Sequence, residues 1–204
     1  MSTAKEKLRI GTCGFAEAQD TTFSDFDIVE VQKTFYQPPR VETAKRWRQK
    51  APPDFVFTLK AWQLITHESS SPTYRRLSES LSDAELNQCG RLRWNDTTRG
   101  AWHRTQKIAD ALDAHAILFQ TPKSFKPTDK NLSYIRSFMS NLVPKNRTLV
   151  FEPRGSGWTD DVLEDLCSGL DLIHCVDPFL RSPVTSGPHH YRLDGRPEYT
   201  YVHG

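Results

Sequence analysis

The sequence contains no apolar run of the length that a membrane-spanning helix needs, which is about 20 residues. Its first residues, 1–7, are polar and include lysines, so they lack the apolar segment of a secretory signal. We therefore expect a cytoplasmic protein that has no membrane partner. The formal net charge of +2 is close to neutral and favours no particular class of partner.

Cysteine is scarce, and short catalytic motifs are missing. The 4 cysteines are widely spaced along the chain and suggest neither a zinc site nor a disulfide framework. We expect them to be free thiols in a reducing compartment. There is also no phosphate-binding glycine loop, no dinucleotide fingerprint and no nucleophile elbow, which disfavours the enzyme classes that carry these motifs. The cysteines are Cys13, Cys89, Cys167 and Cys175.

What the chain does contain is an alternation of short apolar runs with segments of helical periodicity. Its 204 residues suffice for one domain, and we expect a single domain over 1–204 with an elaborated basic insert at about 68–104. The alternation predicts a parallel α/β architecture. Thr128 and Thr159 have the side chains of helix N-caps. Strands are expected at 8–15, 28–31, 55–60, 116–120, 148–154, 172–177 and 190–195, and further helices at 41–51 and 102–112.

The apolar runs share one further feature, because each ends in a polar residue. In a (β/α) barrel the C-terminal strand ends meet at one end, where such enzymes place their sites. An open doubly wound sheet would concentrate ligand groups at one switch point instead. Polar ends on so many successive strands favour a TIM-like (β/α) barrel, here an incomplete one of about seven strands without an eighth. These strand ends carry Glu30, Lys60, Gln120, Glu152, Asp177 and Asp194.

Six short motifs follow one another along the chain. They are G-T-C-G-F at 11–15, V-E-V with T-F-Y and a proline at 29–38, F-V-F-T-L-K with I-T-H at 55–67, F-Q-T-P-K-S-F at 119–125, F-E-P-R with S-G-W at 151–158 and Y-R-L-D-G-R at 191–196. In this order they resemble one known family, the YecE-like family, also called domain-of-unknown-function family 72. The resemblance covers nearly the whole chain. It implies a TIM-barrel fold with a distant similarity to endonuclease IV-like barrels and no settled biochemical role.

The sequence departs from the pattern of this family in three places. The first two strands leave little room for a helix between them. Asp194 stands where the family usually has a histidine. The chain reaches Gly204 before the helix and strand that usually complete such barrels, and 199–202 is too short to supply them.

Four residues are candidates for catalysis: Glu30, Lys60, Glu152 and Asp177. The three carboxylates could bind a divalent metal ion through oxygen ligands, or act as acid and base. Alternatively, they pair with Lys60, Arg154 and Arg192 in a structural network, since a buried charge needs a partner. Lys60 could also form a Schiff base if it were desolvated, although neighbouring carboxylates would keep it charged. Candidates for substrate binding are Tyr36, His67, Gln120, Arg154, Trp158, Arg192, Asp194 and Arg196.

Our leading hypothesis is that the strand ends bind a phosphate-containing ligand, which includes nucleic acids. Hydrolysis of a phosphodiester by a metal-dependent endonuclease is its most concrete enzymatic form. One alternative is an isomerase or lyase that acts on a small sugar or acid through a glutamate base, and another is a non-catalytic binding module. The insert has the composition of a nucleic-acid contact surface, although a solvated loop face would look the same. That composition comes from Arg91, Arg93, Trp94, Arg99, Trp102 and Arg104.

Overall fold

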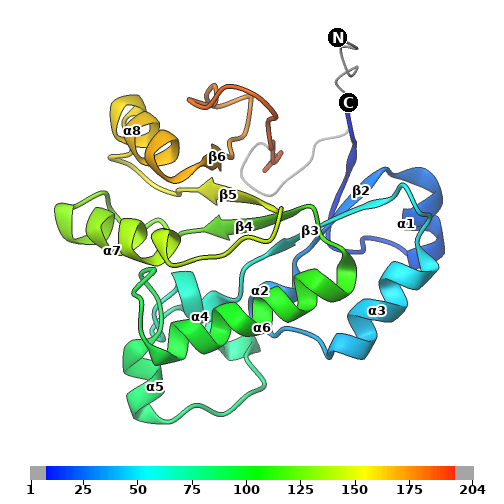
Figure 1. Ribbon diagram of the computed structural model, residues 1–204, viewed down its shortest axis with the longest axis horizontal. Helices are drawn as coiled ribbons and strands as arrows, with labels where there is room; N and C mark the ends of the chain where they lie inside the picture. Colours follow the sequence, from blue (N-terminus) through cyan, green and yellow to red (C-terminus); the bar gives the residue numbers. More distant parts are fainter. Residues whose placement is uncertain (1–7, 196–204) are drawn as a thin grey trace.

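The computed structural model describes residues 8–195, which form one sheet of six parallel strands. The order of the strands in the sheet is their order in the chain, so each strand pairs with its successor (Figure 1). Parallel neighbours need crossover connections, and helices supply them here. The predicted α/β class is thereby confirmed. The strands are β1 (Gly11–Cys13), β2 (Ile28–Val31), β3 (Val56–Lys60), β4 (Ala116–Gln120), β5 (Thr148–Glu152) and β6 (Leu172–His174).

The helices cover the outer side of the sheet. In Figure 1 the strands follow an arc, with α3, α6, α7 and α8 outside it and the segment after β6 (orange to red) inside. No helix within residues 8–195 is long and apolar enough to cross a membrane. The helices are α1 (Gln19–Asp25), α2 (Lys33–Tyr36), α3 (Val41–Lys50), α4 (Gln63–Thr66), the 3-10 helix η1 (Pro72–Arg76), α5 (Asp83–Gln88), α6 (Asp96–Leu112), α7 (Asp129–Ser140) and α8 (Asp160–Leu170).

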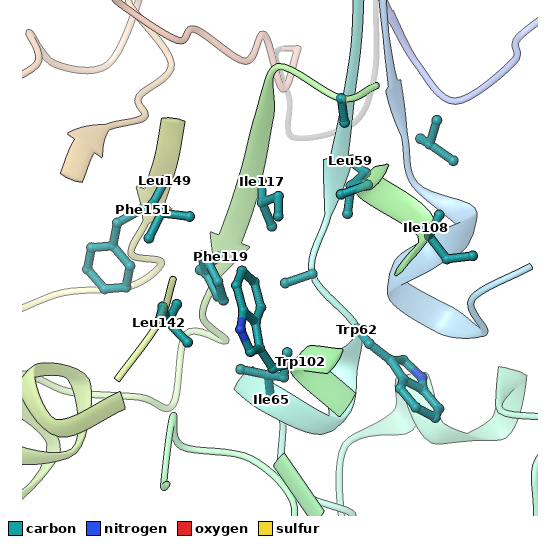
Figure 2. Packing of buried hydrophobic residues seen from close by; sticks show 14 of the residues in the cluster. Leu59, Trp62, Ile65, Trp102, Ile108, Ile117, Phe119, Leu142, Leu149 and Phe151 are labelled. Atoms are coloured by element: carbon teal, nitrogen blue, oxygen red, sulfur yellow. The ribbon is translucent and has the colours of Figure 1, made fainter. Parts of the chain in front are cut away.

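The two faces of the sheet carry different side chains. The face toward the helices holds the main core, in which Trp102 of α6 lies beside Phe119 with 5.8 Å between ring centroids (Figure 2). The opposite face holds only a small apolar cluster of residues such as Leu118 and Val150. Because side chains alternate along a strand, Gln120 and Glu152 share this second face with Leu118 and Val150. The polar strand ends therefore lie on the inner side of the sheet.

Two helices differ from expectation. The connection between β1 and β2 is long enough for α1, whose Phe23 is buried 5.0 Å from the ring of Phe55. Helix α6 begins at Asp96, well before the expected start, because Asn95 and Thr98 form a capping box ahead of it. By contrast, the N-caps predicted for α7 and α8 are confirmed by hydrogen bonds from backbone N–H groups to the two threonine side chains.

The expected seventh strand at 190–195 is not formed as such. Within the described residues it is reduced to a single parallel bridge between Tyr191 and Val176, with a hydrogen bond of 3.0 Å from the Arg192 N–H to the Val176 carbonyl. Pro178 follows closely and lacks an N–H donor, so the ladder does not continue. The segment 199–202 and Arg196 lie outside the described residues.

Candidate functional site

A group of charged and polar side chains gathers at the C-terminal ends of the strands, on the inner side of the sheet. Parallel pairing brings these ends together, and Gln120 and Glu152 are direct partners across β4 and β5. We call this group the polar cluster. It consists of Glu30, Lys60, Gln120, Glu152, Arg154, His190, Arg192 and Asp194.

Arg192 joins the two glutamates of the polar cluster. Its Nε lies 3.2 Å from Oε2 of Glu30, and its Nη1 lies 2.8 Å from Oε2 of Glu152. Another nitrogen, Nη2, is 3.6 Å from the sulfur of Cys13 on β1. The side chains of Glu30 and Glu152 are each 6% exposed, and that of Arg192 is 8% exposed. One buried guanidinium thus connects β1, β2 and β5 to the segment after β6.

Arg154 makes a second pair of contacts beside the first. It lies 2.6 Å from Oε1 of Glu152 and 2.7 Å from Oδ2 of Asp194. Asp177 follows the end of β6 rather than lying in it, and its carboxylate accepts a hydrogen bond from the backbone N–H of Asp194 at 3.3 Å. The same carboxylate accepts from the N–H of Phe179 at 3.0 Å. Asp177 therefore reaches the polar cluster through the backbone of Asp194.

Lys60 is the amine of the polar cluster. Its Nζ donates to Oε1 of Gln120 at 2.6 Å and lies 3.8 Å from the centre of the Phe35 ring. Burial and the nearby Arg192 charge lower the pKa of Lys60 to about 8, against the attraction of Glu30 and Glu152. A lysine of this pKa exchanges protons near neutral pH, which is what a general acid or base requires.

Glu30 is a buried carboxylate that stays ionised. Burial alone would raise its pKa, but His190, Arg192 and Lys60 outweigh burial and hold the pKa below the ordinary value. Its Oε1 has no hydrogen-bond partner within residues 8–195, and neither has Oγ1 of Thr58, its register partner on β3. Buried oxygens without a donor are uncommon in folded proteins. These two atoms could accept hydrogen bonds from a ligand.

His67 lies beside the polar cluster rather than in it. Its ring packs 4.9 Å from Phe35, and its Nδ1 lies 2.8 Å from Oγ1 of Thr66. Burial, with a smaller contribution from the charge of Lys60, lowers the pKa of His67 to about 3. The imidazole is therefore neutral at pH 7 and adds no positive charge for a phosphate.

Two other expected binding residues lie elsewhere. Trp158 belongs to the main core, with its ring 5.6 Å from that of Phe151. Tyr36 packs under the guanidinium of Arg76 at 3.5 Å from its ring centre, and its carbonyl accepts from Gln63. Within residues 8–195, neither side chain forms a hydrogen bond, an ion pair or a ring contact with a residue of the polar cluster.

The three carboxylates proposed as metal ligands do not face a common space. The Arg192 guanidinium lies between Glu30 and Glu152, and Asp177 is directed at backbone N–H groups. Among residues 8–195, no group of three or more His, Cys, Asp and Glu side chains is placed to hold a metal ion. Metal binding by these residues stays a prediction.

The arginines of the insert are tied into the fold. Arg91 pairs with Glu68 at 2.9 Å, and Arg99 pairs with Asp96. Arg93 donates to the carbonyl of Asn87, and Arg104 pairs with Glu79. Trp102 is buried in the core. Each guanidinium therefore has a structural partner.

The sequence reasoning missed three residues around this site. His190, whose Nε2 is 3.7 Å from Oε2 of Glu30, shares its strand parity with Arg192 and Asp194, and that parity was the available signal. Thr58 is likewise two positions before Lys60 and on the same face. The contact between Phe35 and Lys60 has no such signal, because it joins different elements.

The fold and the cluster at its strand ends define an α/β protein of the TIM-barrel type with a buried polar site. The chain belongs to the family described as "Protein of unknown function DUF72", whose model matches residues 20–202. This agrees with the resemblance found in the motifs. No curated protein matches the sequence.

Three solved structures illustrate the similarity of fold. A DUF72 family protein from Thermotoga maritima is 20% identical with a TM-score of 0.62, over 96% of this chain and 78% of that chain. One from Enterococcus faecalis is 18% identical with a TM-score of 0.64, over 93% of this chain and 71% of that chain. D-psicose 3-epimerase, crystallised in the presence of D-fructose, is 15% identical with a TM-score of 0.53, over 82% of this chain and 59% of that chain.

This chain is shorter than those proteins. In a second structure of the Enterococcus faecalis protein, the match covers 83% of this chain and 62% of that chain, at 18% identity and a TM-score of 0.61. The sequence identities are low throughout, so these similarities establish the fold alone.

Proposed function

We propose that the polar cluster is the active site of an enzyme that moves protons on a small hydroxylated carbonyl compound, as isomerases and lyases do. Lys60 carries this proposal, because it is a buried amine whose pKa of about 8 suits proton exchange near neutral pH. This assigns the base to Lys60 rather than to a glutamate. Glu30 is less suited to that role, since its partners hold its pKa below the ordinary value against the effect of burial.

The proposed step uses the charges around Lys60. The neutral amine removes a proton from a carbon next to the carbonyl group, and the electron pair left behind moves onto the carbonyl oxygen. The ammonium so formed is stabilised by Glu30 and Glu152, and the guanidinium of Arg154 or Arg192 stabilises the oxyanion. Return of the proton to the neighbouring carbon, together with transfer of the adjacent hydroxyl proton to the oxyanion, gives an isomer. If the carbonyl instead re-forms and a leaving group departs from the carbon next to the one that lost its proton, a lyase product results.

The ligand class follows from the oxygens that have no donor. Oε1 of Glu30 and Oγ1 of Thr58 are buried acceptors on the inner face, and ligand hydroxyl groups would satisfy them. Hydrolysis of a phosphodiester is supported less well. The described residues supply no group of metal ligands for that reaction.

Deuterium exchange tests the proposal without knowledge of the product. The protein is incubated in D2O with small ketoses, their phosphates and 2-oxo acids, and loss of the proton next to the carbonyl is followed by NMR. D-fructose is a convenient first probe, because the epimerase of similar fold was crystallised with it. We expect exchange with at least one compound, and a loss of about 100-fold or more in Lys60→Met.

Lys33→Met is the matched control, because Lys33 is an exposed lysine on α2. It should exchange at the wild-type rate. If Lys60→Met exchanged as fast as wild type, Lys60 would not be the base. A third outcome is that a compound binds to the wild-type protein and not to Lys60→Met, while neither protein catalyses exchange. The polar cluster would then be a binding site without catalysis.

A further inference from the structure

A cavity lies at the end of the sheet opposite to the polar cluster. Its walls come from the residues that precede β3, β4 and β5 and from α3, and its volume is about 450 Å³. Cavities of this size accept small-molecule ligands. We call it the basal pocket, and its walls include Arg9, Arg48, His115, Lys145 and Arg147.

The walls of the basal pocket carry an excess of positive charge. Four arginine and lysine side chains line it, against the two aspartates Asp54 and Asp113, both of which are exposed residues. A third carboxylate, Asp110, stands behind the wall and pairs with Lys145 at 2.9 Å and with Arg147 at 2.7 Å. The local balance of charge remains positive, which favours an anion.

Arg147 is a largely buried cation, with only 10% of its side chain exposed. Its Nε donates to the carbonyl of Ala114 at 3.0 Å, and its Nη2 contacts Oδ1 of Asp110. Its Nη1 is buried and has no hydrogen-bond partner within the described part of the chain. A buried donor without an acceptor is costly, so an acceptor oxygen at this position would be favourable.

The other two arginines are fixed by backbone carbonyls. Arg48 donates to the carbonyl of Phe55 at 2.7 Å, and Arg9 donates to that of Asp54 at 3.1 Å. A guanidinium has five N–H donors, so both retain donors for a ligand. Three guanidinium groups are therefore held at one cavity before any ligand arrives, which lowers the entropic cost of binding.

We infer that the basal pocket binds the phosphate group of a small phosphorylated molecule, with Arg147 as the buried anchor. A guanidinium fork matches phosphate oxygens in a way that a lysine ammonium does not. The volume leaves room for more than the phosphate itself. This inference is independent of the reaction proposed at the polar cluster, because it rests on residues at the opposite end of the strands.

Inorganic phosphate and pyrophosphate are the probes, added to the ¹⁵N-labelled full chain at constant ionic strength. We expect saturable amide shifts at 113–115 and 145–147. Lys145→Gln should weaken binding about 3-fold, and Arg147→Lys about 10-fold or more, because the fork is lost. Lys130→Gln on α7 is the control for net charge and should change affinity less than about 2-fold.

Three results would overturn the inference. Phosphate shifts that never saturate would indicate general screening. An equal loss of affinity in Lys130→Gln and Lys145→Gln would show that only net charge matters. Binding that survives Arg147→Lys and disappears in Lys60→Met would place the phosphate at the polar cluster. Since Arg147→Lys could also disturb the contact with Asp110, its unfolding midpoint is compared with wild type, and Lys145→Gln keeps the test valid if the fold is weakened.

Discussion

At Lys60, the cost of burying an ammonium group competes with the attraction of Glu30 and Glu152. Burial wins, with help from Arg192, and the pKa falls from 10.5 to about 8. The same shift has a thermodynamic consequence, because a pKa that differs between folded and unfolded chains makes stability depend on pH. Three predictions at the scale of single residues follow from such shifts and pairings.

The first concerns alkaline pH. Between pH 8 and 10.5 the unfolded chain keeps a proton on Lys60 that the folded chain has released, so stability rises with pH in this window. Across this window the free energy of unfolding of wild type should rise by up to about 3 kcal/mol relative to that of Lys60→Met, which lacks the amine. Urea unfolding of both proteins at three pH values measures the difference. A difference that stays constant with pH would contradict the lowered pKa.

The second concerns acid. Folded His67 stays neutral down to a pKa of about 3, whereas its ordinary pKa is 6.5. The unfolded chain therefore binds more protons between these values, and stability is lost as pH falls below 6.5. Wild type should lose about 1.4 kcal/mol per pH unit relative to His67→Gln within this range. Melting temperatures at pH 6.5 and 5 check this, and parallel decreases in both proteins would show that His67 is not the cause.

The third concerns the buried pairing of Arg192 with Glu152. Arg192→Met removes the buried cation that pairs with both Glu30 and Glu152, so it should cost about 3–5 kcal/mol in the free energy of unfolding. Glu152→Gln should cost less, because Arg192 keeps Glu30 and Arg154 keeps Asp194. The double variant should cost clearly less than the sum of the two single changes, since both of them remove the same contact between Arg192 and Glu152. A double-mutant cycle by urea unfolding tests the coupling. Strict additivity would mean that the 2.8 Å contact contributes nothing.

At the scale of elements, the segment 90–92 holds an unusual backbone. Gly90, Arg91 and Leu92 have φ values of 81, 60 and 53° in succession, a left-handed region that is rare outside glycine. Their three N–H groups donate to carbonyls of α4, which are those of Leu64, Thr66 and Ile65 respectively. These bonds fix the insert against the loop that follows β3.

Gly90→Ala should therefore be strongly destabilising. A Cβ at this position would lie 2.5 Å from the backbone nitrogen of Glu68, and the left-handed φ adds strain. We expect a loss of about 2–4 kcal/mol in the free energy of unfolding. Gly100→Ala in α6 is the control, because a Cβ there meets nothing within 4 Å. That control should be neutral or slightly stabilising, and an equal effect of both changes would refute the account.

The elements also show what sequence reasoning can reach. The periods of two and 3.6 located β4 to the residue and placed Glu30, Lys60 and Glu152 at strand ends on one face, because these are local patterns. Helix α1 escaped detection, since a helix of 7 residues has too few turns for a clear period. The bridging position of Arg192 could not be foreseen either, because it depends on contacts between residues distant in sequence.

For the whole molecule, pairing in the sheet predicts a gradient of protection. Leu149–Phe151 in β5 pairs with strands on both sides, whereas within the described residues β1 pairs with β2 and Tyr191 has a single bridge. Amide hydrogens should thus exchange fastest near Cys13 and Arg192 and slowest in β5. Hydrogen exchange resolved by residue measures this order. Uniformly slow exchange would show that the strands at both ends are paired further.

The position of Arg192 in the chain sets the timing of assembly on the ribosome. Glu152 is translated 40 residues before Arg192, and Glu30 earlier still. At about 5–20 residues per second, β5 is complete several seconds before Arg192 is translated. Until then, Glu30 and Glu152 lack the cation that joins them. During that interval Glu152 already has Arg154 as a partner, but burial of the inner face would leave Glu30 without its arginine. Nascent chains that end before residue 192 should therefore remain open to proteases at this face, and completion of the inner side should coincide with the arrival of a single late arginine.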